Sequence, residues 1–243
     1  ISEEYNSKIM IMKKILVTGG NGRFAESLKK IKSNHKFFFR SKGQLDITSI
    51  NSIKRNINQF KPNIVLHLAG LSRPMKIHDT NIQKSINLNV IGTCNLVNIC
   101  FKRKIKLVYF STSYVYAGTK GNYKEEDPVL PWNNYAKSKM AGELAVQMYK
   151  NSLILRVSMT EEPFVHKAAY ANVKSNFMYH NDAGKLLLKV LNKKGIYNFG
   201  GKSQTVFNFI KEKNKKIRKR FSKGEFPLKQ DMSLKKLKNL VKR

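Results

Sequence analysis

The stretch KKILVTGGNGRFA, residues 13–25, decides the fold of this chain. Residues 13–18 form a short apolar run with a β-branched bias, which favours a buried strand. A glycine turn follows at once, and residues 26–31 then have a helical pattern. A strand, a glycine turn and a helix in this order are typical of the corner of a dinucleotide-binding fold that holds phosphates.

Within the turn, the glycines have separate tasks. Gly19 allows the tight turn, and Gly22 lets the backbone approach a pyrophosphate at the positive end of the helix. We therefore predict that Gly19, Asn21, Gly22, Arg23 and Phe24 bind a dinucleotide. A glycine-rich hairpin or a simple loop is the alternative, and the flanking strand and helix patterns disfavour it.

The end of the second predicted strand, residues 36–40, indicates which dinucleotide is preferred. No acidic residue follows it to bind ribose hydroxyls, and Arg40, Ser41 and Lys42 stand there instead. Cations and a hydroxyl at this point suit a 2′-phosphate. We expect NADPH to be preferred over NADH, with Arg40 as a cofactor-binding residue.

Two further segments are predicted to contact the cofactor. Asp46, with Ile47 beside it, could accept hydrogen bonds from adenine or from neighbouring backbone, but Asp46 could equally be an acid at the N-terminus of the helix beginning near Thr48. Residues 62–70 read as another buried strand that ends in small residues, and we assign Leu68, Ala69 and Gly70 to the cofactor site.

The segment 135–139 places a phenol and an amine four residues apart, at the start of a predicted helix. Side chains at this spacing share one helical face, so the Lys139 ammonium can favour the ionised form of Tyr135. Such a tyrosine can pass a proton to or from a sugar oxygen. Taken alone, the pair is weak evidence and favours a solvated surface pair, because Tyr and Lys at helical spacing are common.

Several segments together resemble the extended short-chain dehydrogenase/reductase family, the nucleotide-sugar epimerases, dehydratases and reductases. Besides the glycine turn and the strand at 62–70, they are the helix opening at 87–93, the strand and hydroxyl cluster at 106–116, and the stretch 125–143. The resemblance covers about residues 13–200. It implies that Tyr135 is the acid/base and that Lys139 binds the nicotinamide ribose while lowering the tyrosine pKa. It also implies that Thr112 bonds the substrate oxygen, with Ser113 as a fallback, and that Asn89 is structural.

The hydroxyl cluster STSYVY, residues 111–116, separates the branches of that family. Dehydratases carry an Asp-Glu pair directly after the threonine, and this chain has Ser113 and Tyr114 there. The form is similar to the dTDP-4-dehydrorhamnose reductase branch, which implies reduction of a nucleotide-linked 4-keto-6-deoxy sugar. An epimerase on the same scaffold and a non-catalytic dinucleotide-binding regulatory protein are the alternatives.

Alternating strand and helix patterns predict a Rossmann fold, an α/β doubly wound parallel sheet with helices on both faces. We divide the chain into an N-terminal extension (1–12), a dinucleotide-binding domain (13–158) and a small, abbreviated substrate-binding part (159–243). That last part is interleaved with returning Rossmann elements and ends in a basic tail. Residues 152–157 read as a sixth strand, and residues 181–188, 205–210 and 233–243 read as helices.

The charge of the chain is extreme, with 47 lysines and arginines against 15 acidic residues, a formal net charge of +32. Such a field attracts anions. The basic residues are spread along the whole chain, which favours compositional drift over a nucleic-acid surface, so we expect no nucleic-acid partner. The sharpest cluster, residues 211–223, reads as a solvated helix face with its tail.

The remaining expectations concern location and partners. No signal pattern and no apolar run of about 18 residues is found, so we expect a cytoplasmic protein without membrane contact. Cys94 and Cys100 are predicted to be buried free thiols on a helix, and the five histidines have no metal-ligand spacing. The family resemblance implies a homodimer that pairs through the Tyr135–Lys139 helix.

Overall fold

A computed structural model describes residues 12–241, and most of the predicted N-terminal extension lies outside this range. Its centre is a six-stranded sheet in which every neighbouring pair is parallel. The strands, in spatial order, are β2 (Lys36–Arg40), β1 (Lys14–Thr18), β3 (Ile64–His67), β4 (Lys106–Thr112), β5 (Ser152–Val157) and β8 (Gly195–Phe199). The chain runs outward from β1 in both directions, so β1 and β3 flank the topological switch point of a doubly wound sheet.

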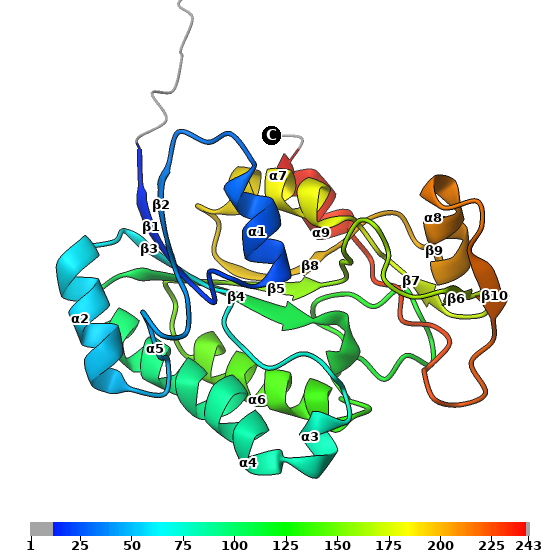
Figure 1. The fold of residues 1–243 in the computed structure, drawn as a ribbon, viewed down its shortest axis with the longest axis horizontal. Coiled ribbons are helices and arrows are strands. Elements are labelled where there is room, and N and C mark those ends of the chain that lie inside the picture. The colour runs from blue at the N-terminus through cyan, green and yellow to red at the C-terminus, as the bar shows by residue number, and fades with distance from the viewer. Residues whose placement is uncertain (1–11, 242–243) are drawn as a thin grey trace, which may run out of the picture.

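Helices cover both faces of this sheet (Figure 1). One face carries α1 (Arg23–Lys29), α7 (His180–Val190) and α9 (Lys235–Val241). The other carries α2 (Ile50–Phe60), α5 (Gly92–Lys102) and α6 (Asn134–Gln147). The predicted Rossmann fold is therefore confirmed.

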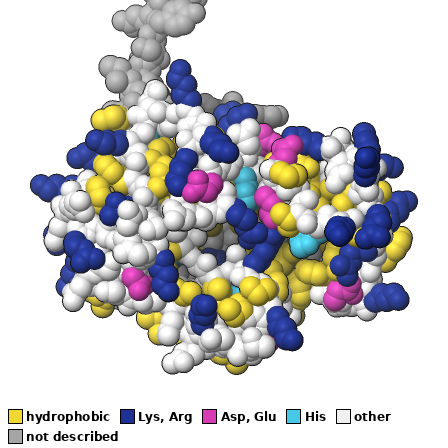
Figure 2. Space-filling view, in the orientation of Figure 1, with side chains coloured by type: hydrophobic (Ala, Val, Ile, Leu, Met, Phe, Trp, Pro, Cys, Tyr) yellow, Lys and Arg dark blue, Asp and Glu magenta, His cyan; other side chains and the backbone are white. Residues whose placement is uncertain are grey.

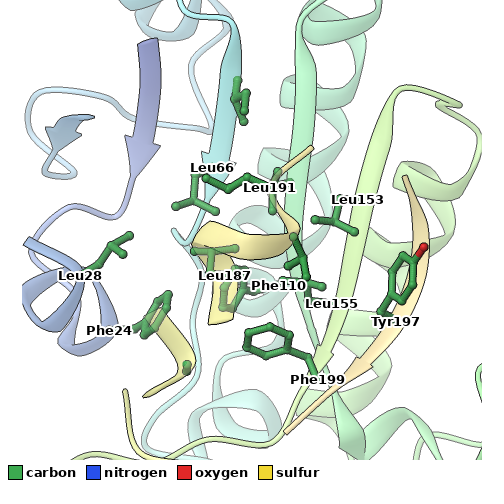
Figure 3. Close-up of a cluster of buried hydrophobic side chains, with 14 of the residues drawn as sticks. Phe24, Leu28, Leu66, Phe110, Leu153, Leu155, Leu187, Leu191, Tyr197 and Phe199 are labelled. Carbon is green, nitrogen blue, oxygen red and sulfur yellow. The ribbon is translucent and has the colours of Figure 1, made fainter. Parts of the chain in front are cut away.

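Successive residues of β1 point to opposite faces of the sheet and so pack into two separate hydrophobic cores. Ile15 and Val17 pack with Phe24 and Leu28 of α1, whereas Leu16 packs on the opposite face. The central strands β3 and β4 are buried throughout because both faces are covered, which is why they read as continuous apolar runs, whereas the edge strand β2 is only half-buried. Figure 3 shows the first of these cores, in which α1 and α7 contribute to the same apolar cluster as β3, β4, β5 and β8.

The strand count and the start of one helix differ from the sequence predictions. Residues 152–157, which read as a sixth strand, form the fifth strand along the chain. The long helix predicted to open at 87–93 starts earlier. After α3 (Ile77–Thr80), Asn81 caps α4 (Ile82–Ser85), which continues through a π-helical turn (Ile86–Ile91) into α5.

A small satellite core is built from the C-terminal third of the chain. It contains β6 (Ala168–Tyr170), α8 (Val206–Lys213) and β10 (Arg218–Arg220), around Ala169, Phe207 and Ile210. The short pair β7 (Lys174–Ser175) and β9 (Gln204–Thr205) lies beside it. Residues 211–223 are not one helix face: α8 ends at Lys213, and the exposed strand β10 pairs with β6.

Both cysteines lie on α5 as free thiols, Cys100 buried and Cys94 only half-buried. Burial raises the pKa of the Cys100 thiol to about 12, which leaves it protonated and unreactive at neutral pH. Within residues 12–241, no helix is both long enough and apolar enough to cross a bilayer.

Candidate active site

A cleft of about 440 Å³ opens at the carboxyl ends of the central strands. Its walls are the glycine turn after β1 and the segments that follow β3, β4 and β5, together with the start of α6. Ligands of open parallel sheets bind at this edge, next to the switch point. In the view of Figure 2 the surface is hollowed near the centre of the molecule, and basic side chains lie at the edge of the hollow.

The glycine turn can exist only without side chains at its first position. Gly19 has φ +69°, and a Cβ there would lie 2.7 Å from Cα of Ala69. Gly22 precedes α1 as its N-cap and donates its N–H to the Gly19 carbonyl at 2.9 Å. The structure places the predicted residues Gly19, Asn21, Gly22, Arg23 and Phe24 together in the wall of the cleft.

Thr112, Tyr135 and Lys139 line the same cleft. Thr112 is the last residue of β4. Asn133 caps α6 by accepting the N–H of Ala136 at 2.7 Å, which sets Tyr135 in the first turn of that helix. Three residues that are far apart in the sequence thus meet where the strand ends and the helix begins. The fallback residue Ser113 also lines the cleft, one position further along.

Burial raises the pKa of Tyr135 above its ordinary value of 10.0, while the Thr112 hydroxyl and the Arg73 guanidinium oppose the rise. The resemblance implied a lowered pKa, with Lys139 as its cause. In the structure burial prevails, and the opposing cation is Arg73. Tyr135 is therefore a protonated phenol at neutral pH, able to give up a proton.

Burial lowers the pKa of Lys139 to about 7, and the Glu143 carboxylate opposes that shift. The residue is 8% exposed, and its Nζ lies 4.1 Å from the centroid of the Tyr109 ring. Tyr135, Lys139 and Glu143 follow one another at intervals of one helical turn on α6.

A buried ion pair between Glu143 and Arg156 lies on this face of α6. Glu143 is fully buried, and its Oε1 accepts a hydrogen bond from Arg156 Nη2 at 2.7 Å. The same carboxylate accepts the Ser111 hydroxyl, and Arg156 also donates to Tyr116 at 2.8 Å. The position of Glu143 four residues after Lys139 was visible in the sequence, but its partner on β5 was not.

Asn89 fixes the wall of the cleft, in agreement with its predicted structural role. From the π-helical turn, its amide accepts the Leu71 N–H at 2.7 Å and donates to the Leu71 carbonyl at 2.9 Å. It also donates to Ser138 of α6 at 2.9 Å. Asn89 therefore ties the segment after β3 to the helix that carries Tyr135.

The remaining predicted cofactor residues divide into two groups. Leu68, Ala69 and Gly70 line the cleft, and the Ala69 N–H is held by the Thr18 hydroxyl at 3.1 Å. Arg40, Asp46 and Ile47 are not among the residues that line the cleft.

These three residues have other contacts. The Arg40 guanidinium lies 5.1 Å from the centroid of the Phe60 ring, and Ile47 is buried. Asp46 accepts the Thr48 N–H and hydroxyl at 2.9 and 2.7 Å, whereas the cap of α2 is Ser49. Of the two interpretations of Asp46, the contact with neighbouring backbone is the one present.

Arg73, Glu161 and His180 also line the cleft, and sequence reasoning missed them. They follow β3, follow β5 and begin α7, respectively. Each is a single charged or titratable side chain in or next to a loop, without a periodic pattern, so no sequence signal could single it out in so basic a chain.

The parallel sheet, the glycine turn and the tyrosine and lysine on one helix define a protein of the extended short-chain dehydrogenase/reductase class. More narrowly, the chain belongs to the family described as RmlD substrate binding domain, whose model matches residues 12–178.

Curated relatives match over a similar region. A dTDP-4-dehydrorhamnose reductase of Aggregatibacter actinomycetemcomitans is 30% identical over 154 residues, which are 61% of this chain and 52% of the relative. The methionine adenosyltransferase 2 subunit beta of Xenopus laevis is 30% identical over 155 residues, 60% of this chain and 46% of the relative. The chain thus spans about half the length of the curated relatives it matches.

Solved structures agree on the fold over nearly the whole chain. A dTDP-4-dehydrorhamnose reductase of Bacillus anthracis in complex with NADP has a TM-score of 0.84 and 21% identity, covering 94% of this chain and 92% of that one. The UDP-glucose 4-epimerase of Thermus thermophilus complexed with NAD has a TM-score of 0.75 and 20% identity, covering 95% and 93%. At these identities the likeness concerns the fold alone.

Proposed function

We propose that this chain is an NADPH-dependent reductase of a nucleotide-linked 4-keto-6-deoxy sugar. One observation carries the proposal: Thr112, Tyr135 and Lys139 line the same cleft as the glycine turn. The similarity to a dTDP-4-dehydrorhamnose reductase supports the substrate class, and the NADP bound to the Bacillus anthracis structure supports the cofactor.

The cleft fits a dinucleotide at the end formed by Gly19 and Gly22. Backbone stands where side chains would otherwise fill the turn, since a Cβ on Gly22 would lie 3.1 Å from the Gly19 carbonyl oxygen. Residues 19–24 would hold the pyrophosphate, and Lys139 would hold the nicotinamide ribose. NADPH, when bound, supplies the hydride that reduces the C4 carbonyl.

Thr112 would stabilise the negative charge that develops on the substrate, and Tyr135 would supply the proton. Thr112 donates a hydrogen bond to the carbonyl oxygen and stabilises the negative charge that develops on it. Tyr135, which is protonated at neutral pH, donates a proton to that oxygen. The part beyond residue 158 would bind the nucleotide sugar, and Phe177 from this part already lines the cleft.

The test measures NADPH oxidation at 340 nm with a dTDP-linked 4-keto-6-deoxyhexose, alongside thermal-shift panels of NADPH, NADH and nucleoside diphosphate sugars. The proposal predicts one NADPH consumed for each sugar reduced. An epimerase would convert the sugar without net consumption of cofactor, and that result would replace the proposal with its nearest rival.

A second candidate is a non-catalytic regulatory subunit that binds a dinucleotide. The similarity to the methionine adenosyltransferase 2 subunit beta favours it. It predicts that NADPH raises the melting temperature while no 4-keto sugar is turned over. Isothermal titration calorimetry together with the turnover assay separates the two candidates.

We also propose a homodimer formed through α5 and α6. Three large apolar side chains on or next to these helices are exposed, Phe101 at 66%, Leu144 at 53% and Met148 at 86%. Large exposed apolar side chains on two packed helices fit a subunit contact.

A further inference from the structure

Two arginines from different segments meet on one carboxylate in the cleft. Glu161 Oε1 accepts hydrogen bonds from Arg73 Nη1 at 2.6 Å and from Arg23 Nη1 at 3.3 Å. The carboxylate is the enclosed member of the group, since its side chain is 13% exposed against 39% for Arg73 and 48% for Arg23. Both cations therefore remain accessible to a solute, while the anion sits between them.

The cluster of Arg23, Arg73 and Glu161 lies beside the glycine turn that is proposed to bind phosphate. Arg23 is the first residue of α1 and directly follows Gly22. Arg73 stands across the cleft in the segment after β3, and Glu161 reaches in from the segment after β5. One carboxylate thus bridges three walls of the cleft beside the glycine turn.

The two arginines of this bridge can bind a phosphate as well as a carboxylate. A guanidinium presents the same pair of donors to a carboxylate and to a phosphate. The position of the Glu161 oxygen is therefore one that a phosphate oxygen could take with both arginines unchanged. A carboxylate left beside a bound phosphate would repel it, so the two anions compete for one place.

We propose that Glu161 is a displaceable stand-in for phosphate: it occupies the anion subsite between Arg23 and Arg73 until the diphosphate of a dinucleotide or nucleotide sugar replaces it. The inference rests on the proposed function in taking the ligand to be a nucleotide diphosphate. It assigns Glu161 the role of a specificity residue, because only a group that binds both arginines more strongly than one carboxylate does can enter.

Glu162 supplies a matched control. It is the next residue and also pairs with a cation, Lys213 Nζ at 2.7 Å, yet it is not among the residues that line the cleft. Glu161→Gln and Glu162→Gln therefore remove the same charge from adjacent positions, one inside the subsite and one outside it.

The experiment titrates the wild type and both variants by calorimetry with inorganic pyrophosphate, NADPH and thymidine diphosphate. Glu161→Gln is expected to bind pyrophosphate about fivefold to tenfold more tightly than the wild type, with Glu162→Gln unchanged. A gain for NADPH alone assigns the subsite to the cofactor, and a gain for thymidine diphosphate alone assigns it to the substrate. Unchanged or weaker binding by Glu161→Gln overturns the inference, because the carboxylate would then position the arginines instead of competing.

A second variant keeps the inference separate from simple charge effects. Arg73→Gln combined with Glu161→Gln should lose the gain in pyrophosphate affinity, since one half of the subsite is gone; a retained gain contradicts the inference. Absence of heat with NADPH and thymidine diphosphate in all proteins, with the pyrophosphate pattern intact, would refute the proposed function and leave the subsite standing. If NADPH binds, and if neither the NADPH affinity nor the pyrophosphate affinity differs among the wild type and the two single variants, the inference about Glu161 is refuted and the proposed function stands.

Discussion

Lys139 Nζ lies 4.1 Å from the centroid of the Tyr109 ring, in a position where little of the lysine side chain reaches solvent. The ring face is a favourable neighbour for an ammonium, and Glu143 lies one helical turn further along. Burial nevertheless outweighs the Glu143 carboxylate and lowers the pKa of Lys139 to about 7. The Lys139 side chain is thus only partly charged at neutral pH.

This shift predicts a pH-dependent stability. The pKa of Lys139 is about 7 in the folded protein and 10.5 in its ordinary state. Between those values the unfolded chain holds a proton that the folded chain has lost, so the free energy of unfolding rises with pH. Lys139→Met should remove about 2 kcal/mol of the rise between pH 7 and pH 9. Urea unfolding at both pH values measures it, and an unchanged slope in the variant would refute it.

The buried ion pair predicts a large loss of stability. Glu143→Gln leaves Arg156 charged and only 3% exposed, so unfolding should become easier by about 3–5 kcal/mol. The surface pair between Glu26 and Lys29 provides the control, because Glu26→Gln should cost at most about 1 kcal/mol. Denaturant midpoints of the two variants test the contrast. Equal losses of stability in the two variants would contradict the prediction that the buried ion pair contributes more than the surface pair.

The glycine turn predicts a position-specific cost. Gly19→Ala should lower the free energy of unfolding by about 1–3 kcal/mol and weaken NADPH binding, because φ is +69° and the new Cβ would press on Ala69. Gly43→Ala is the matched change, since a Cβ there meets nothing within 4 Å. Thermal melts with and without NADPH give both readouts. A Gly19→Ala protein that behaves like Gly43→Ala would contradict the assignment of the turn.

The proposed dimer predicts a change in mass. Met148→Asp places a charge in the exposed apolar surface on α5 and α6, which should convert the dimer to a monomer in light scattering after size exclusion. Phe221→Asp alters a side chain that is 59% exposed in the small C-terminal part and should leave the mass unchanged. A wild-type monomer at all concentrations would rule out the dimer.

Much of the central fold was predictable because its signals are local. The apolar runs at 14–18, 64–67 and 106–112 are continuous because both sheet faces are covered, and continuity is readable from the sequence. The start of the helix at 134–147 and the helix predicted at 181–188, observed at 180–190, were placed close to their observed positions. The π-helical turn was not found, because Asn89 stabilises it through contacts with Leu71 and Ser138 that no local pattern encodes.

The small C-terminal part and the rim of the cleft were less predictable for the same reason. The strands β6, β7, β9 and β10 are two or three residues long, too short for periodicity to register. Arg73 and Glu161 come together only through the tertiary fold. The sequence did identify Thr112, Tyr135 and Lys139 as candidates, and the structure places all three in one cleft, but their catalytic roles remain predictions.

The central claim, that Tyr135 donates the proton in a hydride transfer, is tested most directly by Tyr135→Phe. The measurement is the rate of NADPH oxidation with a dTDP-linked 4-keto-6-deoxyhexose, made together with the dissociation constant for NADPH. We predict a rate at least about 100-fold below that of the wild type, with NADPH affinity changed by no more than about twofold, because the variant loses only the proton donor. A variant that oxidises NADPH at the wild-type rate would contradict the account.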